Sequence, residues 1–381
     1  MICAMDQMKA RQGLRPVMGL LLILCALALG AESPLAVTVA PERVWIVEGD
    51  GFRKVNFDFL VANAGATPVA IVELKLVVRD GLGGFVLGRE LNRQGMIPSI
   101  ASLLTTEIGP GKTVQLLNPF SEFPMSVELG VLEYTLVFEP KAAEGSPEPA
   151  PIELKVQVRP QEFKPRTKLS LPIKGKVYII DGHDLMAHHR RIDMTHPLIV
   201  GLGMKHNISR FGMDFVVIDA AGSHFKGDGG KVEDYYVFGK PVLAPAAGVV
   251  ADCIDGRPDN RIGEFNMDYD ELMRTKDLRL FGGNFVVLDH GDGEFTFFAH
   301  LQNNSQKVKK GDRVAAGQEI GRVGNSGDSF WPHLHFQVMT SASFDCELLP
   351  PVFASYTLFR GNRAFKIRNG MPDTGDLIEQ R

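Results

Sequence analysis

Two histidines, His333 and His335, are separated by one residue in the apolar run 331–338, which is typical of a β-strand. Residues i and i+2 of a strand point to the same face, and at roughly 3.3 Å per residue the two positions lie about 7 Å apart. Two imidazoles on one face suit one metal ligand and one neighbouring acid–base group. Taken alone, the pair also fits two unrelated surface histidines.

Two further segments carry residues of the same chemistry. His300 lies near the end of the apolar run 297–301, and Asp214 is the single carboxylate of the run 211–215. A carboxylate in an apolar run is costly to bury, so it needs a cation or hydrogen-bond donors. Zinc binds histidine nitrogen and carboxylate oxygen, and a catalytic zinc site keeps one position for water. Such a water has a pKa of about 7 and can attack an amide while a nearby histidine transfers protons.

A longer series of motifs surrounds these residues. In chain order they are 212–214 (GMD), 239–250 (GKPVLAPAAGVV), 283–291 (GNFVVLDHG), 298–301 (FAHL), 308–312 (VKKGD), 320–327 (IGRVGNSG) and 332–336 (PHLHF). With these motifs in this order, the domain resembles the LytM-type zinc endopeptidases of family M23, which cut peptide cross-links of bacterial cell walls. The resemblance implies an antiparallel β fold and bound Zn²⁺.

The resemblance also implies the roles of individual residues. Asp214 and His335 match two of the family's three zinc ligands. His300 and His333 match the two histidines that flank the metal-bound water and steady the tetrahedral intermediate. The segment 324–327 matches the turn before the His-x-His strand, where glycine is suitable because it adopts positive φ freely.

One position departs from the family pattern. The family's first ligand stands four residues before its aspartate, and here that position is Arg210, a charged guanidinium that cannot bind zinc. A branch of the family with arginine there resembles this chain in a His-His-Arg-Arg run upstream, which favours His189 or His188 as the substitute ligand. His206 is another candidate if the chain turns back after it. A site without a third ligand, with 187–191 as a basic surface turn, stays open.

The N-terminus is typical of an exported protein. Lys9, Arg11 and Arg15 precede the uncharged apolar run 17–30, and we predict a signal peptide over residues 1–31. The run is shorter than the roughly 20 residues that span a bilayer. Cleavage would release the chain to the periplasm or the cell exterior, and an uncleaved N-terminal anchor is the alternative.

Turn signals separate short alternating segments before residue 160, and we expect about seven strands there. Strands are predicted at 55–59, 71–77, 131–138 and 152–158. The fold class is therefore mainly β, with an N-terminal immunoglobulin-like β-sandwich followed by a C-terminal antiparallel β domain of the LytM type. The predicted divisions are the signal peptide, the sandwich (32–159), a Pro-containing linker (160–175), the M23-like domain (176–355) and a C-terminal tail (356–381).

All ten histidines lie in the predicted M23-like domain, 176–355. Its long insertion, 255–282, falls between two expected central strands and contains the one helix that we predict, 269–275. A long loop of this kind often shapes or covers an active site. The acidic residues of 268–271 fit a solvated face better than a second metal site.

Composition narrows the function further. The net charge of −4 and pI of about 6.2 argue against a nucleic-acid-binding protein, which normally has a basic surface. Cys253 and Cys346 remain after signal cleavage and could form a disulfide or stay as two separate thiols. The chain has no CxxC motif, which argues against a cysteine-rich zinc site or a thioredoxin-type redox site.

Two functions fit these observations. The first is an exported zinc metallopeptidase that hydrolyses peptide bonds of peptidoglycan, or of another peptide, through zinc-activated water, with His300 and His333 at the oxyanion. The second is a non-catalytic LytM-like module that binds or regulates cell-wall hydrolases. The four retained site residues favour the enzyme, and Arg210 favours the module. The sandwich could contact an envelope or peripheral membrane partner.

Overall fold

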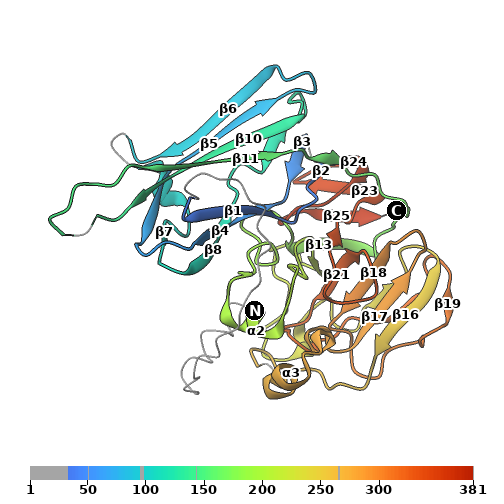
Figure 1. Ribbon diagram of the computed structural model, residues 1–381. Helices are drawn as coiled ribbons and strands as arrows, with labels where there is room; N and C mark the ends of the chain where they lie inside the picture. The colour runs from blue at the N-terminus through green and yellow to red at the C-terminus, as the bar shows by residue number, and fades with distance from the viewer. Residues whose placement is uncertain (1–32, 50, 95–97, 143, 265–266, 381) are drawn as a thin grey trace.

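The computed structural model describes residues 33–380 except 50, 95–97, 143 and 265–266. The predicted signal peptide, 1–31, lies outside the described residues. Within the described part, the chain is mainly β, as predicted (Figure 1). None of the described helices has the length and apolar character needed to cross a membrane.

The N-terminal region packs two sheets around one core. The first sheet has the order β1 (Leu35–Ala40), β4 (Asp58–Asn63), β8 (Lys112–Leu117). The second has the order β11 (Ile152–Val158), β10 (Val131–Pro140), β5 (Val69–Arg79), β6 (Phe85–Asn92), with β7 (Glu107–Ile108) beside β5 and the 3₁₀ turn η1 (Ser99–Ser102) nearby. Phe59 and Val61 of one sheet and Leu76 and Leu136 of the other are fully buried in the shared core. The immunoglobulin-like topology of this region stays a prediction.

The strand predicted at 55–59 is interrupted in the structure. β3 (Phe52–Val55) ends at Val55 and β4 begins at Asp58, so Asn56 and Phe57 between them belong to neither strand. Their polar groups bond outside this region: the Asn56 amide donates to the carbonyl of His183 (3.1 Å), and the Phe57 carbonyl accepts from Arg190 (3.2 Å). The alternation of apolar residues continues, but the backbone leaves the sheet to meet the C-terminal region.

A small sheet joins the two halves of the chain. Its order is β12 (Gln161–Glu162), β2 (Trp45–Gly49), β3, β9 (Glu122–Pro124), with β12 parallel to β2. Leu169, Leu171 and Ile173 are buried in the C-terminal core. Residues 160–175, predicted as a linker, are therefore packed against both halves.

The C-terminal region is built on an eleven-stranded sheet. The order is β19 (Arg313–Val314), β16 (Gly248–Ile254), β17 (Phe285–Asp289), β18 (Phe295–Ala299), β21 (Leu334–Met339), β14 (Met213–Val216), β13 (Gly175–Asp181), β25 (Leu377–Gln380), β23 (Phe353–Arg360), β24 (Arg363–Gly370), with β22 (Leu348–Leu349) beside β21. A separate pair is formed by β15 (Pro241–Leu243) and β20 (Glu319–Arg322). Every residue of β21 is buried, as expected of a central strand covered on both faces.

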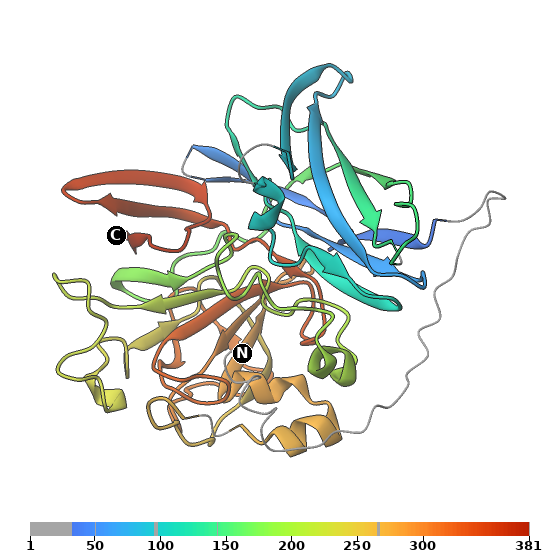
Figure 2. The same ribbon diagram turned by 90° about the vertical axis from the view of Figure 1, so that its left-hand side faces the viewer.

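The segment predicted as a C-terminal tail, 356–381, is corrected by the structure. In its described part it supplies most of β23 and all of β24 and β25, which extend the large sheet beyond β13. The reason is its apolar content: Leu358 and Ile378 are almost fully buried and pair across β23 and β25. Figure 2 shows the β23–β24 hairpin projecting from the sheet.

Short helices lie at the edges of the C-terminal region. They are α2 (Pro197–Leu202), α3 (Tyr269–Thr275), and the 3₁₀ turns η2 (Val232–Asp234) and η3 (Leu278–Gly282). The predicted helix at 269–275 is confirmed as α3, and the Asp268 carboxylate caps it by accepting from the Glu271 amide at 2.8 Å. Cys253 and Cys346 are both free thiols, so the structure does not contain the disulfide that the sequence allowed.

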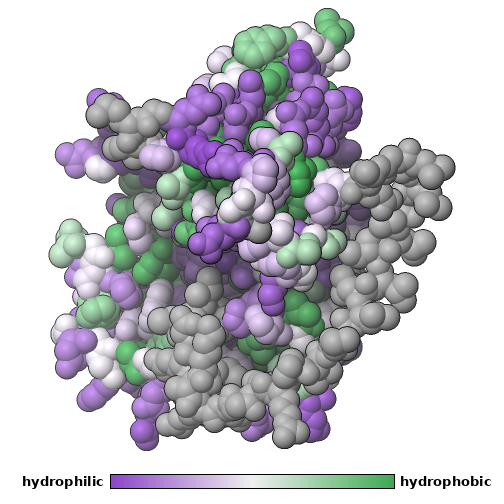
Figure 3. All heavy atoms as spheres, turned by 60° about the vertical axis from the view of Figure 1, so that its left-hand side comes forward, coloured by the Kyte–Doolittle hydropathy of each residue, from purple (hydrophilic) through white to green (hydrophobic). Residues whose placement is uncertain are grey.

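Figure 3 shows one face of the molecule, on which hydrophilic side chains are mixed with small apolar areas. Apolar side chains lie at the top, over the turn between β5 and β6, where Leu82 is fully exposed and Phe85 is 67% exposed.

Candidate active site

Strands β14 and β21 bring the first two site residues together. The strands are antiparallel neighbours with Asp214 opposite His335, and Asp214 Oδ1 lies 3.0 Å from His335 Nδ1. The other ring nitrogen of His335 lies 2.9 Å from Gln337 Oε1, and this acceptor requires a proton on Nε2. Nδ1 and the carboxylate oxygen then both present lone pairs, so a proton or a cation is needed between them.

His189 approaches the same carboxylate from a loop after β13. Its side chain is 3% exposed, and its Nε2 lies 3.4 Å from Asp214 Oδ1. Nδ1 donates to the Gly182 carbonyl at 3.1 Å, which leaves the lone pair on Nε2 facing Asp214. The rings of His189 and His335 lie 4.9 Å apart. The structure therefore places His189 in the site.

His188 lies beside His189 but in a different environment. Its ring is 4.0 Å from that of His189, its side chain is 50% exposed, and Nδ1 is paired with Asp181. Ligand atoms of Asp181, His188, His189 and Asp214 all lie within 4.8 Å of one another, a spacing that can hold a metal ion. Asp181 was not predicted as a site residue, because no motif in the sequence around it points to a metal site.

His300 and His333 complete the group of histidines. Their rings lie 4.7 Å apart. His300 Nδ1 donates to the Ser326 carbonyl at 2.8 Å, and His333 Nδ1 donates to the Trp331 carbonyl at 2.9 Å. Each neutral ring therefore keeps its lone pair on Nε2, and His333 Nε2 lies 3.6 Å from Asp214 Oδ1. His300 has a φ of +60°, a conformation that non-glycine residues adopt rarely and often at functional sites.

The glycine turn predicted before the His-x-His strand is confirmed as a conformational requirement. Gly327 has a φ of +75°. A Cβ on Gly324 would lie 2.3 Å from the Gln302 nitrogen, so only glycine fits there. The turn positions Ser326, whose carbonyl orients the His300 ring.

The insertion at 255–282 packs against this turn. The Asn260 amide donates to the carbonyls of Gly327 (2.8 Å) and Ser329 (2.7 Å), and Asp259 Oδ1 accepts from the Asn325 nitrogen at 2.7 Å. At its other end, Phe281 lines the site cavity. The expectation that this loop helps to shape the site agrees with these contacts.

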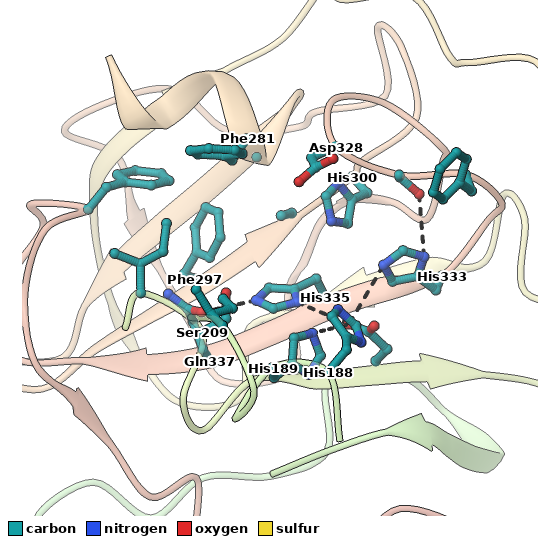
Figure 4. A pocket seen from close by; sticks show the side chains of 18 of the residues that line it. His188, His189, Ser209, Phe281, Phe297, His300, Asp328, His333, His335 and Gln337 are labelled. Carbon is teal, nitrogen blue, oxygen red and sulfur yellow. Dashed lines mark hydrogen bonds and ion pairs between the residues drawn. The ribbon is translucent and has the colours of Figure 1, made fainter. Parts of the chain in front are cut away.

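The site opens into a cavity of about 610 Å³. Figure 4 shows the five histidine rings on one side of it, with Phe281 and Phe297 across from them. Other apolar lining residues are Ile192, Ile208 and Phe344. The cavity therefore combines a polar reaction side with an apolar wall, which is typical of a substrate-binding pocket.

Burial and close contacts shift the pKa values of the site residues. Burial alone would raise the pKa of Asp214, but His189 and His333 beside it hold that pKa well below its usual range. Burial, reinforced by His333 and His335, holds the pKa of His300 well below its usual range. Burial also lowers the pKa values of His189 and His333. A carboxylate surrounded by neutral imidazoles suits a divalent cation.

Residues 234–345 match the family described as Peptidase family M23. This chain contains a peptidase domain of family M23. The match and the described strands agree with the resemblance found in the sequence.

Two curated endopeptidases are similar to short segments of this chain. The peptidoglycan DD-endopeptidase ShyA of Vibrio cholerae is 42% identical over 59 residues, which are 16% of this chain and 13% of the relative. The glycyl-glycine endopeptidase ALE-1 of Staphylococcus capitis is 48% identical over 62 residues, which are 16% of this chain and 17% of the relative. The matches thus span only about one sixth or less of the length of these relatives.

Among solved structures, the catalytic domain of lysostaphin from Staphylococcus simulans is 23% identical. The match covers 47% of this chain and 89% of that one, with a TM-score of 0.25.

Arg210, at the family's usual first-ligand position, and His206, a candidate substitute ligand, both lie away from Asp214. Arg210 is buried and directs its guanidinium to Asp58 of β4 at 2.8 Å. His206 lines a separate small cavity of about 70 Å³ next to Arg210 and Lys205. The structure brings neither residue to Asp214, whereas it does bring His189 there.

The metal-free protein is expected to lose stability as the pH falls below about 6.5, the ordinary histidine pKa. Burial lowers the folded-state pKa of His183, His189 and His300, so in this range the unfolded chain binds more protons. Each such histidine contributes up to about 1.4 kcal/mol per pH unit, present above pH 6.5 and lost as the pH falls toward the folded pKa. Urea unfolding at pH 7.5 and 5.5 measures this. Equal free energies of unfolding at both values would contradict it.

Proposed function

We propose that this chain is an exported zinc endopeptidase that hydrolyses peptide bonds of peptidoglycan. The observation that carries the proposal is the approach of His189, His333 and His335 to one buried carboxylate, Asp214, at 3.0–3.6 Å. The M23 match supports peptide hydrolysis, and the similarity to a peptidoglycan DD-endopeptidase supports a cell-wall substrate. The basic and apolar N-terminal residues support export.

Asp214, His335 and His189 are the zinc ligands in this proposal. Their oxygen and nitrogen atoms are the donor types that zinc prefers, and three protein ligands leave a position for water. His189 is favoured over His188 because its Nε2 faces Asp214 while its Nδ1 is fixed by the Gly182 carbonyl. Such a hydrogen bond to the second nitrogen is usual for a metal-binding histidine. His188, half-exposed and paired with Asp181, lacks this arrangement.

His300 and His333 carry out the proton chemistry. When bound, zinc supplies a water of pKa about 7 and polarises the scissile carbonyl. In the neutral form of each ring the proton is on Nδ1, which donates to a backbone carbonyl. Nε2 is therefore the atom that accepts a further proton. Once protonated, Nε2 donates a hydrogen bond to a developing oxyanion. The low histidine pKa values keep both rings ready to accept at neutral pH.

The test combines metal analysis with digestion of purified peptidoglycan, for the wild type and for His335→Ala. We expect about one zinc per chain and release of new amino groups by the wild type, and neither from the variant. A wild type without stoichiometric zinc and without cleavage would overturn the proposal. A wild type that binds zinc but leaves the wall intact would point to the non-catalytic module.

A further inference from the structure

The carboxylate of Asp58, in the N-terminal region, binds two arginines of the C-terminal region. Asp58 Oδ2 lies 2.8 Å from Arg210 Nη1, and Oδ1 lies 3.2 Å from Arg190 Nη2. The side chains are 1%, 6% and 2% exposed, respectively. Charged side chains are rarely buried this completely without a specific partner.

Both arginines lie next to proposed metal ligands in the chain. Arg190 directly follows His189, and Arg210 precedes Asp214 by four residues. A further contact joins the two segments, because the Asn207 amide donates to the carbonyls of His189 (2.9 Å) and Arg190 (3.2 Å). His189 belongs to neither a helix nor a strand, so side-chain contacts of this kind determine its position.

Neighbours of Asp58 complete the contact. Arg190 also donates to the carbonyls of Phe57 (3.2 Å) and Asn118 (3.1 Å). Asn56 Oδ1 accepts from Arg210 at 3.0 Å, and its amide donates back to the Arg210 carbonyl at 3.4 Å. Three of these four bonds use Asn56 or Phe57, the two residues between β3 and β4.

The charge balance makes the carboxylate essential to this arrangement. Burial lowers the pKa of Arg210, and the charge of Asp58 opposes that effect. Without the carboxylate, two guanidinium groups would share one buried space with no counter-charge. Breaking a buried pair in this way is strongly unfavourable, because the remaining charge stays desolvated.

We propose that Asp58 is a positioning residue of the metal centre. Through Arg190 and Arg210 it holds the segments that carry His189 and Asp214, so the N-terminal region is part of the scaffold of the site. The inference rests on the proposed function in one respect, the assignment of His189 as a ligand. It also explains the arginine at the usual first-ligand position, whose side chain serves the contact between the two regions.

The experiment compares full-length Asp58→Asn with the control Glu133→Gln, which makes the same change from carboxylate to amide. Glu133 pairs with Arg79 at 2.6 Å inside the N-terminal region. Zinc affinity is measured by competition with a chromophoric chelator. We expect Asp58→Asn to bind zinc roughly 10–100-fold more weakly, the loss typical of removing a residue that orients a ligand. Glu133→Gln is expected to keep wild-type affinity.

Hydrogen exchange of the metal-free proteins gives a readout that does not depend on metal. Residues 187–192 should exchange faster in Asp58→Asn than in the wild type or in Glu133→Gln. If Asp58→Asn does not fold, Arg190→Lys replaces it, because lysine keeps the charge but cannot reach all three acceptors.

Unchanged zinc affinity with unchanged exchange would overturn the proposal, as would equal losses in the test variant and the control. A wild type that binds no zinc would overturn the proposed function instead. In that case the exchange of residues 187–192 still decides whether Asp58 positions the segment.

Discussion

Replacing His189 with alanine is expected to remove zinc from the protein, whereas replacing His188 is expected to leave it bound. The His189 ring is 3% exposed and presents Nε2 to Asp214 at 3.4 Å, while the His188 ring is half-exposed and pairs with Asp181. Loss of a direct ligand should weaken binding by more than the roughly 10–100-fold that loss of an orienting partner costs. Peptidoglycan hydrolysis should fall with the metal.

Metal content after dialysis, measured by atomic emission, checks this prediction. His206→Ala is the matched control, because His206 lines a different cavity and should bind zinc as the wild type does. Full zinc in both His188→Ala and His189→Ala would show that the substitute-ligand assignment is wrong. Loss of zinc only in His188→Ala would show that His188, and not His189, is the third ligand.

Replacing His300 with alanine should lower the rate of hydrolysis by roughly 10²–10⁴-fold, the usual contribution of a general acid–base group. Zinc should remain, because His300 bonds to the Ser326 carbonyl and is not one of the proposed ligands. The effect should therefore appear in kcat at unchanged metal content. His333→Ala should behave alike, since its ring lies 4.7 Å from that of His300.

The double variant His300→Ala/His333→Ala separates shared from independent roles. If the two rings act on one oxyanion, the double variant should be little slower than either single variant, because residues that act as a unit are strongly non-additive. A wild-type rate for His300→Ala would remove this histidine from the mechanism.

The sequence was informative where local pattern determines structure. The His-x-His spacing predicted two rings on one side, and His333 and His335 both approach Asp214. The helix at 269–275 and the glycine requirement near Ser326 were also predicted correctly, since capping and backbone sterics are local effects. The family resemblance favoured His189 or His188, and of the two the structure brings the His189 ring to Asp214 at 3.4 Å.

Contacts between distant segments could not be predicted in this way. Arg210 and Asp58 are 152 residues apart, and no periodicity links them. The strand predicted at 55–59 shows the same limit, because its alternation is correct but Asn56 and Phe57 bond to another part of the chain. Asp181 gave no signal, whereas Gln337 could have been found as the next residue on the face of His335.

The pairing of β14 with β21 also determines when the proposed zinc site can be complete. Asp214 and His335 are 121 residues apart, so their meeting requires closure of a long loop. The three proposed ligands therefore meet only after β21 has been synthesised and has joined the sheet. Chains rich in such distant pairings fold slowly. In the proposed function, assembly of the complete ligand set is thus a late step of folding.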